Sequence, residues 1–129
     1  MAELRTFLRE VARRPFVWGR SDCLLTGADW VRAVEGHDPA GAWRGQYDTE
    51  DEAEAILILG GGLRSLIGAA LRRPETASPR IGDVGVVSVR GLNGRADVTA
   101  ICTGARWAAK SPRGLWIGTA EPVAAWRIG

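Results

Sequence analysis

The residues best suited to chemistry in this sequence lie in one short stretch, from Pro15 to Cys23. An aromatic segment meets Gly19, the helix-capping residues Ser21 and Asp22 follow, and Cys23 then opens an apolar run. With Asp22 as the N-cap, Cys23 is expected to be the first residue of a helix. Unpaired backbone N–H groups and the positive end of the helix dipole favour a thiolate at that position. The pattern is typical of a cysteine nucleophile, and Cys23 is the candidate.

A nucleophilic cysteine needs a base within hydrogen-bond reach, and that base is usually a histidine held by a third polar group. The one histidine, His37, follows the far end of a helix expected over residues 23–34. Such a helix separates its ends by roughly 16 Å, so we expect His37 to be a loop or capping residue. Asp97 can face Cys23 from a strand, but a carboxylate is a poor base for a thiol and disfavours the thiolate. Lys110 can lower a thiol pKa by its charge without serving as an ordinary base. Without a histidine partner, Cys23 also fits a small, half-buried residue at a helix start.

No group of residues has the spacing of a metal or cofactor site. His37, Asp38 and the two cysteines lack the spacing of zinc ligands. The acidic run from Glu50 to Glu54 fits a solvated helix face better than a carboxylate pair for glycoside chemistry. Three consecutive glycines at 60–62 follow a helix instead of a strand and have no partner lysine, which argues against a phosphate-binding loop. We therefore expect neither a cofactor nor a metal.

The composition indicates a single globular domain over residues 1–129. The chain is 46% hydrophobic and 25% charged, and it is long enough to bury a full core. Its net charge of +2 gives no case for a nucleic-acid partner. Lys110 is the only lysine among 17 basic residues, and there are six tryptophans. Arginine and tryptophan are enriched in interfaces, although genomic base composition is the simpler reason for the arginines.

The cysteines and the hydropathy of the sequence bear on its compartment and on membrane insertion. Cys23 and Cys102 do not make a disulfide framework, and both are expected to be reduced. Residues 1–14 are amphipathic and charged, unlike a signal peptide. No apolar run approaches the ~20 residues of a membrane span.

The elements that position these residues are expected to be helices first and strands afterwards. Helices are predicted over 2–13, which Pro15 stops, over 23–34 with Gly36 after its end, from a Thr49–Glu52 capping box to residue 60, and over 63–71. Gly27 and Ala28 give the second helix a small-residue notch that allows close packing. Strands are predicted near 84–89, 98–103, 106–109, 115–117 and 124–128, with turns at Asn93-Gly94 and at 111–114. Helices packed on a C-terminal antiparallel sheet make an α+β fold, with a helical part of about 1–73 and a sheet part of about 80–129.

The stretch Phe16-Val17-Trp18-Gly19, followed by Asp22-Cys23, resembles the NlpC-type, papain-like cell-wall peptidases. In that family an aromatic segment leads to an Asp-Cys pair whose cysteine is the nucleophile. The later Gly82-Asp83-Val84 resembles the Pro-Gly-Asp-Leu that opens the family's sheet. The family's next strand carries the catalytic histidine, and the matching position here falls on Asp97 or Val98. The resemblance implies a degenerate papain-like, NlpC-like fold and a pseudoenzyme without the catalytic histidine.

A second resemblance covers nearly the whole chain. It is to uncharacterised proteins encoded among the tail genes of phages and of gene-transfer-agent-like prophages in α-proteobacteria. The residues that carry it are Gly36-His37-Asp38-Pro39 with Arg44-Gly45-x-Tyr47, Gly61-Gly62-Leu63, and Gly114-Leu115 with Ala125-Trp126. This resemblance implies a role at the tip or hub of a phage tail, and it does not imply activity.

Three functions follow from these observations. The one we favour is a structural tail-tip or tail-hub protein, a virion component made in the bacterial host cytoplasm, that binds other tail proteins through an inactive NlpC-like domain. The second is an active cysteine peptidase or amidase that uses Cys23 to cleave peptidoglycan peptides when the phage enters its host. The third is a non-viral binding module or assembly chaperone of the same fold. None of the three calls for a nucleic-acid partner or a membrane span.

Overall fold

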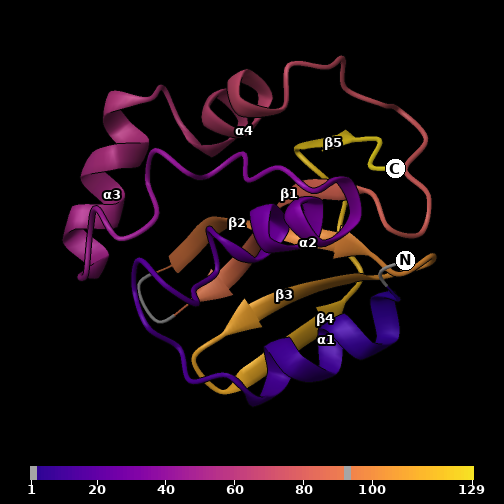
Figure 1. Cartoon of the computed structure of the whole chain (residues 1–129), viewed down its shortest axis with the longest axis horizontal. Helices are drawn as coiled ribbons and strands as arrows, with labels where there is room; N and C mark the ends of the chain where they lie inside the picture. Colours follow the sequence, from indigo (N-terminus) through magenta and orange to yellow (C-terminus); the bar gives the residue numbers. More distant parts are fainter. Residues whose placement is uncertain (1–2, 92–93) are drawn as a thin grey trace.

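A computed structural model describes residues 3–91 and 94–129, and in this part of the chain four helices precede a five-stranded sheet (Figure 1). The helices are α1 (Leu4–Arg13), α2 (Thr26–Glu35), α3 (Glu50–Leu59) and α4 (Leu63–Leu71). The strands are β1 (Val84–Gly91), β2 (Gly94–Cys102), β3 (Trp107–Ser111), β4 (Gly114–Gly118) and β5 (Ala124–Trp126). The predicted α+β fold class, with helices packed on a C-terminal antiparallel sheet, is confirmed.

Local signals set most of the helix boundaries. Helix α1 ends at Arg13, two residues before Pro15. At the start of α3 the Thr49 hydroxyl accepts the backbone N–H of Glu52 at 3.1 Å, which is half of the predicted capping box. Gly36 ends α2 with a φ of +82°, a left-handed conformation that glycine adopts without strain. Helix α4 has the predicted bounds.

The sheet has the strand order β4-β3-β2-β1-β5, and every neighbouring pair is antiparallel. Strand β1 pairs with β2 along its whole length, from Val84 opposite Ile101 to Gly91 opposite Gly94. The predicted turn at Asn93-Gly94 includes Asn93, which lies outside the described residues. Strand β5 returns to the free side of β1, so β1 and β2 are central while β4 and β5 form the edges.

Helices cover one face of the sheet. Helix α2 packs over β1 and β2, and α1 packs over β3 and β4 (Figure 1). The core beneath the helices includes Leu24, Val31, Val86, Ile101 and Trp126. A second cluster, which includes Val87, Val98, Ala100 and Trp107, lies on the opposite face. There Trp107 presses so closely on Gly85 that a Cβ at that glycine would lie 2.7 Å from the indole ring.

Helices α3 and α4 form a bent pair at one side of the molecule (Figure 1). The chain bends by 68° between them, where Gly61 and Gly62 have φ values of +81° and +101°. Leu63 and Ile67 are buried in the core, whereas Ile58 and Leu59 are 71% and 88% exposed. No described helix is by itself long and apolar enough to cross a membrane, and α3 with α4 meets that test only as a bent pair.

Candidate functional site

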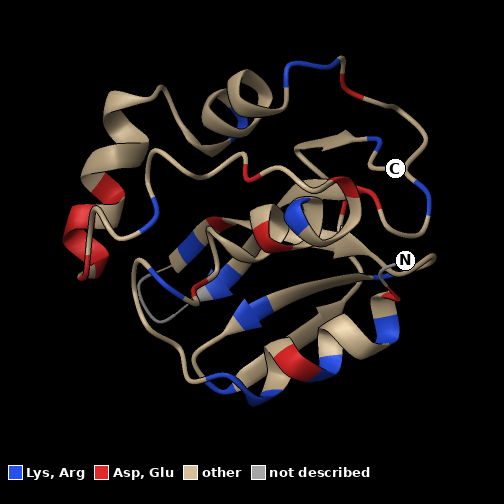
Figure 2. Ribbon diagram, viewed as in Figure 1, with Lys and Arg blue, Asp and Glu red and all other residues tan. Residues whose placement is uncertain are grey.

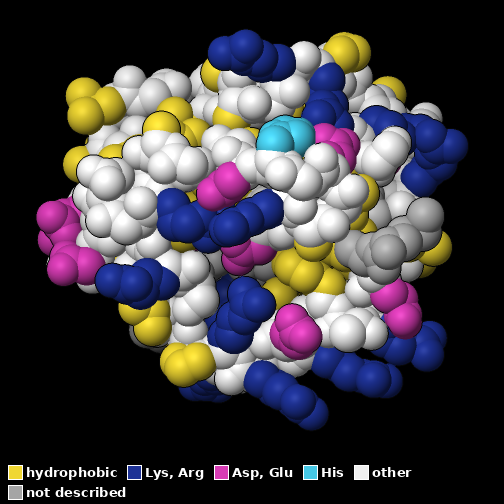
Figure 3. Space-filling view, in the orientation of Figure 1, with side chains coloured by type: hydrophobic (Ala, Val, Ile, Leu, Met, Phe, Trp, Pro, Cys, Tyr) yellow, Lys and Arg dark blue, Asp and Glu magenta, His cyan; other side chains and the backbone are white. Residues whose placement is uncertain are grey.

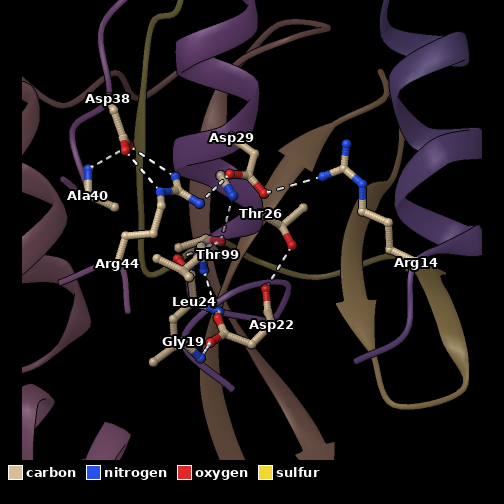
Figure 4. A network of polar contacts seen from close by, with 12 residues as sticks. Arg14, Gly19, Asp22, Leu24, Thr26, Asp29, Asp38, Ala40, Arg44 and Thr99 are labelled. Atoms are coloured by element: carbon tan, nitrogen blue, oxygen red, sulfur yellow. Dashed lines mark hydrogen bonds and ion pairs between the residues drawn. The ribbon is translucent and has the colours of Figure 1, made fainter. Parts of the chain in front are cut away.

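Cys23 precedes the helix instead of opening it. Helix α2 begins at Thr26, so the prediction that it starts at Cys23 is wrong by three residues. The Asp22 carboxylate accepts the N–H groups of Leu24 and Leu25 at 2.8 and 2.9 Å, while the Thr26 hydroxyl donates to the Asp22 carbonyl (Figure 4). These bonds hold Cys23 in a tight turn. Asp22 therefore caps this turn, as expected of its type, and the helix proper starts after it.

Asp22 is the centre of a buried cluster of hydrogen bonds. Its side chain is fully buried, and the oxygen that faces away from the turn accepts the Gly19 N–H and the Tyr47 hydroxyl, both at 2.7 Å. Burial, and then the bond to Asp22, raise the pKa of Tyr47. Gly19 has a φ of +81°, and a Cβ there would lie 1.9 Å from the Tyr47 carbonyl oxygen. Gly45 donates its N–H to the Gly19 carbonyl, so the stretch before Cys23 is locked against the loop that contains Tyr47.

The thiol of Cys23 lies in surroundings that oppose ionisation. Burial raises the pKa of Cys23 to about 12, and the negative charge of Asp22 adds to the effect. The expectation of a thiolate stabilised by a helix N-terminus is therefore wrong. Its physical reason is that the thiol is buried, with the negative charge of Asp22 as a second cause, and that α2 begins only at Thr26.

Thr99 on β2 is the residue that contacts the cysteine turn. Its N–H and its hydroxyl both lie within hydrogen-bond distance of the Cys23 carbonyl, at 3.0 and 3.1 Å. The same hydroxyl accepts the Gly27 N–H at 2.9 Å, which ties the start of α2 to the sheet. A Cβ at Gly27 would lie 2.9 Å from the Thr99 Cβ, so this contact requires glycine. Thr99 was not among the residues that the sequence singled out.

The two positions matched to the family histidine lie just before Thr99 on β2. Because side chains alternate along a strand, Asp97 is on the Thr99 side of the sheet and Val98 is on the other. Val98 is buried in the second core cluster. Asp97 is exposed and forms no hydrogen bond or ion pair with any residue of the ranges 3–91 and 94–129. The structure thus places Asp97 on the cysteine side of the sheet, but Thr99 makes the contact with Cys23.

His37 and Lys110, the basic residues considered as partners for Cys23, have other partners in the structure. His37 lies beyond the far end of α2, exposed, with its Nε2 2.9 Å from Glu35 Oε1, and is the cyan side chain in Figure 3. Its predicted loop position agrees with the structure. Lys110 is buried and donates from Nζ to the carbonyl oxygens of Val11 and Arg14, which ends α1. Burial, with a smaller effect of Arg14, lowers the pKa of Lys110.

An ion-pair network fastens the following loop to α2. Arg44 lies 2.8 Å from Asp29 on α2, and its Nε and Nη2 donate to the two oxygens of Asp38 at 2.9 and 3.0 Å (Figure 4). The hydrogen bond from Arg44 is the main cause that lowers the pKa of Asp38. Asp38 also accepts the Ala40 N–H, which closes the loop on itself. The Asp38–Arg44 spacing was visible in the sequence, and it is the signal that could have located this network.

No metal site accompanies this joint. In the part of the chain that the structure describes, no three histidine, cysteine, aspartate or glutamate side chains group as metal ligands. Cys23 and Cys102 are both free thiols, and the buried Cys102 contacts the Gly104 carbonyl at 3.4 Å. The arrangement around Asp22 can hold four segments together: the stretch 15–23, helix α2, the loop 37–47 and strand β2. We call it the Asp22 joint.

Comparison with known proteins places the chain in a family without assigning it a reaction. No curated protein matches the sequence, and no solved structure matches it. One family model, described as a domain of unknown function (DUF6950), matches residues 1–128. The matched region includes every residue of the Asp22 joint and all five strands of the sheet. The chain belongs to the DUF6950 family.

Proposed function

We propose that this chain is a structural protein of a phage tail, at the tip or hub, in which a papain-like, NlpC-like scaffold serves assembly and not peptide hydrolysis. The tail assignment rests on the motif resemblance described above. The non-catalytic assignment rests on one observation: His37, the one histidine of the sequence, lies beyond the far end of α2 and is bonded to Glu35, away from Cys23. Burial also raises the pKa of the Cys23 thiol to about 12. A thiol of that pKa is a poor nucleophile at neutral pH unless a base removes its proton.

The polar groups around the cysteine are already committed to the backbone. The Thr99 hydroxyl accepts the Gly27 N–H and contacts the Cys23 carbonyl, and a neutral hydroxyl is no base for a thiol. The Asp22 carboxylate already accepts four hydrogen bonds, from three backbone N–H groups and one phenol. Both groups therefore act as structural acceptors, and neither has the free lone pair and position that proton abstraction needs.

The motifs behind the tail resemblance also have architectural partners. Asp38 binds Arg44, which holds α2, and Tyr47 binds Asp22. The glycine pair at 61–62 allows the bend between α3 and α4. Trp126 is 1% exposed and lies under α4, where a Cβ at Gly68 would be 3.5 Å from its ring. These motif residues hold parts of the scaffold together and do not line an open cleft, which supports an assembly role.

The non-catalytic assignment is tested on the thiol itself. In a Cys102→Ala background, alkylation of Cys23 by iodoacetamide should rise about tenfold per pH unit across neutral and mildly alkaline pH, without a plateau. Purified protein should release no peptides from peptidoglycan sacculi, and Cys23→Ala should behave the same way. Peptide release that disappears in Cys23→Ala would establish the peptidase alternative and refute this proposal, and a reactivity plateau near pH 7 would contradict the raised pKa of Cys23.

The tail assignment is tested separately on particles. Mass spectrometry of purified virions should find the chain in tails, and crosslinking should join it to tip or hub proteins. Particles that carry Cys23→Ala should assemble as the wild type does. If the chain is missing from tails and crosslinks in cells only to proteins that never enter the particle, the assembly-chaperone alternative replaces the tail role.

A further inference from the structure

Helix α1 presents a row of arginines to the surface. Arg5, Arg9 and Arg13 recur every four residues and are exposed, while Phe7 and Val11 face the core. Successive members of the row rise about 6 Å along the helix. None of the three forms an ion pair with an acidic side chain in residues 3–91 or 94–129. We call this row the arginine ridge, and in Figure 3 dark-blue side chains line the lower edge of the molecule, where α1 lies.

Helix α3 presents a face of the opposite kind. Glu50, Asp51 and Glu54 are exposed and form no ion pair within the described chain, and Ile58 and Leu59 follow them, 71% and 88% exposed. Glu52 is not part of this set, because the Thr49 hydroxyl and the Asp48 N–H occupy its carboxylate. We call the five residues the α3 face. It carries negative charge at its start and apolar surface at its end.

These two surfaces lie on different sides of the molecule, as the red start of α3 and the separate blue segments of α1 show in Figure 2. They therefore cannot satisfy each other within one copy. Glu50 and Glu54 are four residues apart, as are Arg9 and Arg13, so the charges on the two helices have the same spacing of about 6 Å. We propose that the arginine ridge of one copy binds the α3 face of a second copy.

The surroundings of α1 favour an antiparallel arrangement of the two helices. The turn between β3 and β4 lies at the C-terminal end of α1, where a Cβ at Gly114 would be 3.4 Å from the Ala12 carbonyl (Figure 1). Ile117, further along edge strand β4, therefore lies toward the N-terminal half of α1. It is 51% exposed and on the face that α1 covers, since its alternate neighbour Leu115 pairs with Lys110, which bonds to α1. Antiparallel docking sets the acidic start of α3 on Arg9 and Arg13, and its apolar end beside Ile117.

A contact between two different patches is heterologous, so in a pair of copies one copy keeps its α3 face free and the other keeps its arginine ridge free. Repetition of such a contact gives a closed ring or an open chain of copies. Because the charged part of the interface is exposed, the assembly should weaken as salt rises. This inference uses only the surfaces of the chain and does not depend on the proposed tail role.

The test is a charge swap followed by sedimentation. The wild type should sediment as species larger than a monomer in about 50 mM NaCl, and as a monomer in about 500 mM NaCl. Arg9→Glu/Arg13→Glu should be monomeric at both salt concentrations, and so should Glu50→Lys/Glu54→Lys. Mixed in equal amounts, these two variants should assemble again, because each ridge then meets an α3 face of opposite charge. Circular dichroism confirms that each variant is folded.

A matched control changes the same number of charges elsewhere. Arg90→Glu/Arg106→Glu replaces two exposed arginines outside α1 and should assemble as the wild type does. A Leu59→Ser variant should shift the midpoint of assembly to at least several-fold higher protein concentration. A monomeric wild type at low salt, or a failure of the mixed variants to assemble, would overturn the proposal. If Arg9→Glu/Arg13→Glu instead loses binding to a DNA fragment or to anionic vesicles while its oligomeric state equals that of the wild type, the ridge serves a polyanion and the proposal is wrong.

Discussion

Asp22→Asn tests the Asp22 joint with almost no change in shape. The carboxylate accepts four hydrogen bonds, two at each oxygen, and three of the donors are backbone N–H groups. An amide has one oxygen, so its NH₂ group must face two of these donors. With the NH₂ turned toward Leu24 and Leu25, two buried N–H groups lose their acceptor. The better orientation turns it toward Gly19 and Tyr47, because the phenol can rotate to accept a hydrogen bond.

The expected loss of stability follows from that better orientation. One buried N–H, that of Gly19, is left without an acceptor, which costs about 1–3 kcal/mol. The remaining bonds become neutral ones, which are weaker than bonds to a carboxylate by about 1 kcal/mol in sum. The free energy of unfolding should therefore fall by about 3 kcal/mol. Tyr47→Phe is the matched control, since it removes one bond and orphans no donor, and it should cost about 1.5 kcal/mol.

Urea titration followed by tryptophan fluorescence measures both values, since the chain has six tryptophans. A second readout is specific to the joint. Because Asp22 helps to raise the pKa of Cys23, Asp22→Asn should lower that pKa and speed alkylation of the folded protein at a fixed pH. An Asp22→Asn variant that loses less stability than Tyr47→Phe, with unchanged alkylation, would refute the joint as described.

Two further predictions concern other parts of the scaffold. Gly19→Ala should lower the free energy of unfolding by several kcal/mol, because its Cβ would lie 1.9 Å from the Tyr47 carbonyl oxygen at a φ of +81°. The control Gly36→Ala has a φ of +82° but nothing near its Cβ, so it should cost only about 1–2 kcal/mol. Equal losses of the two variants in thermal unfolding would contradict this prediction. Hydrogen bonds from Arg73 lower the pKa of Glu35 from 4.5 to about 2, so the stability it contributes is present above pH 4.5 and is lost as the pH falls through 2. Glu35→Gln should be less stable than the wild type by about 2 kcal/mol at neutral pH, the gap should close between pH 4.5 and 2, and a gap that is independent of pH would exclude this assignment.

The parts of the fold that the sequence predicted correctly depend on signals a few residues apart. The Thr49–Glu52 cap, the break at Pro15 and the left-handed Gly36 are each contained in one turn of chain. The start of α2 was predicted wrongly because Asp22 caps a separate turn before the helix, and the contact that holds the first turn of α2 comes from the distant strand β2. Thr99 binds Gly27, 72 residues earlier, and no local pattern announces that pairing.

In the candidate site too, local features were predicted and long-range contacts were not. The sequence identified Gly27 as a notch for close packing, which agrees with the structure, whereas Asp22 caps the turn before α2 and not the helix itself. It proposed Asp97 opposite Cys23, and the partner is Thr99, one step further on the same side of β2. The register of β2 against α2 comes from core packing on both faces of the sheet, which a single sequence does not reveal. A lone threonine in the apolar run 98–102 was the available signal.

The pairing of Gly27 with Thr99 also sets the order in which a new chain can complete its structure. Thr99 comes 72 positions after Gly27, and the ribosome takes about 4–14 s to add that length at about 5–20 residues per second. During that interval the apolar side of α2, including Trp30 and Val31, has no sheet to cover it. The hydrogen bonds within residues 15–48 can form before β2 is synthesised, but the contacts of this segment with β2 can form only afterwards. A chain still on the ribosome therefore exposes the apolar face of α2 for several seconds. The yield of folded protein in cells should depend on chaperones that bind nascent chains.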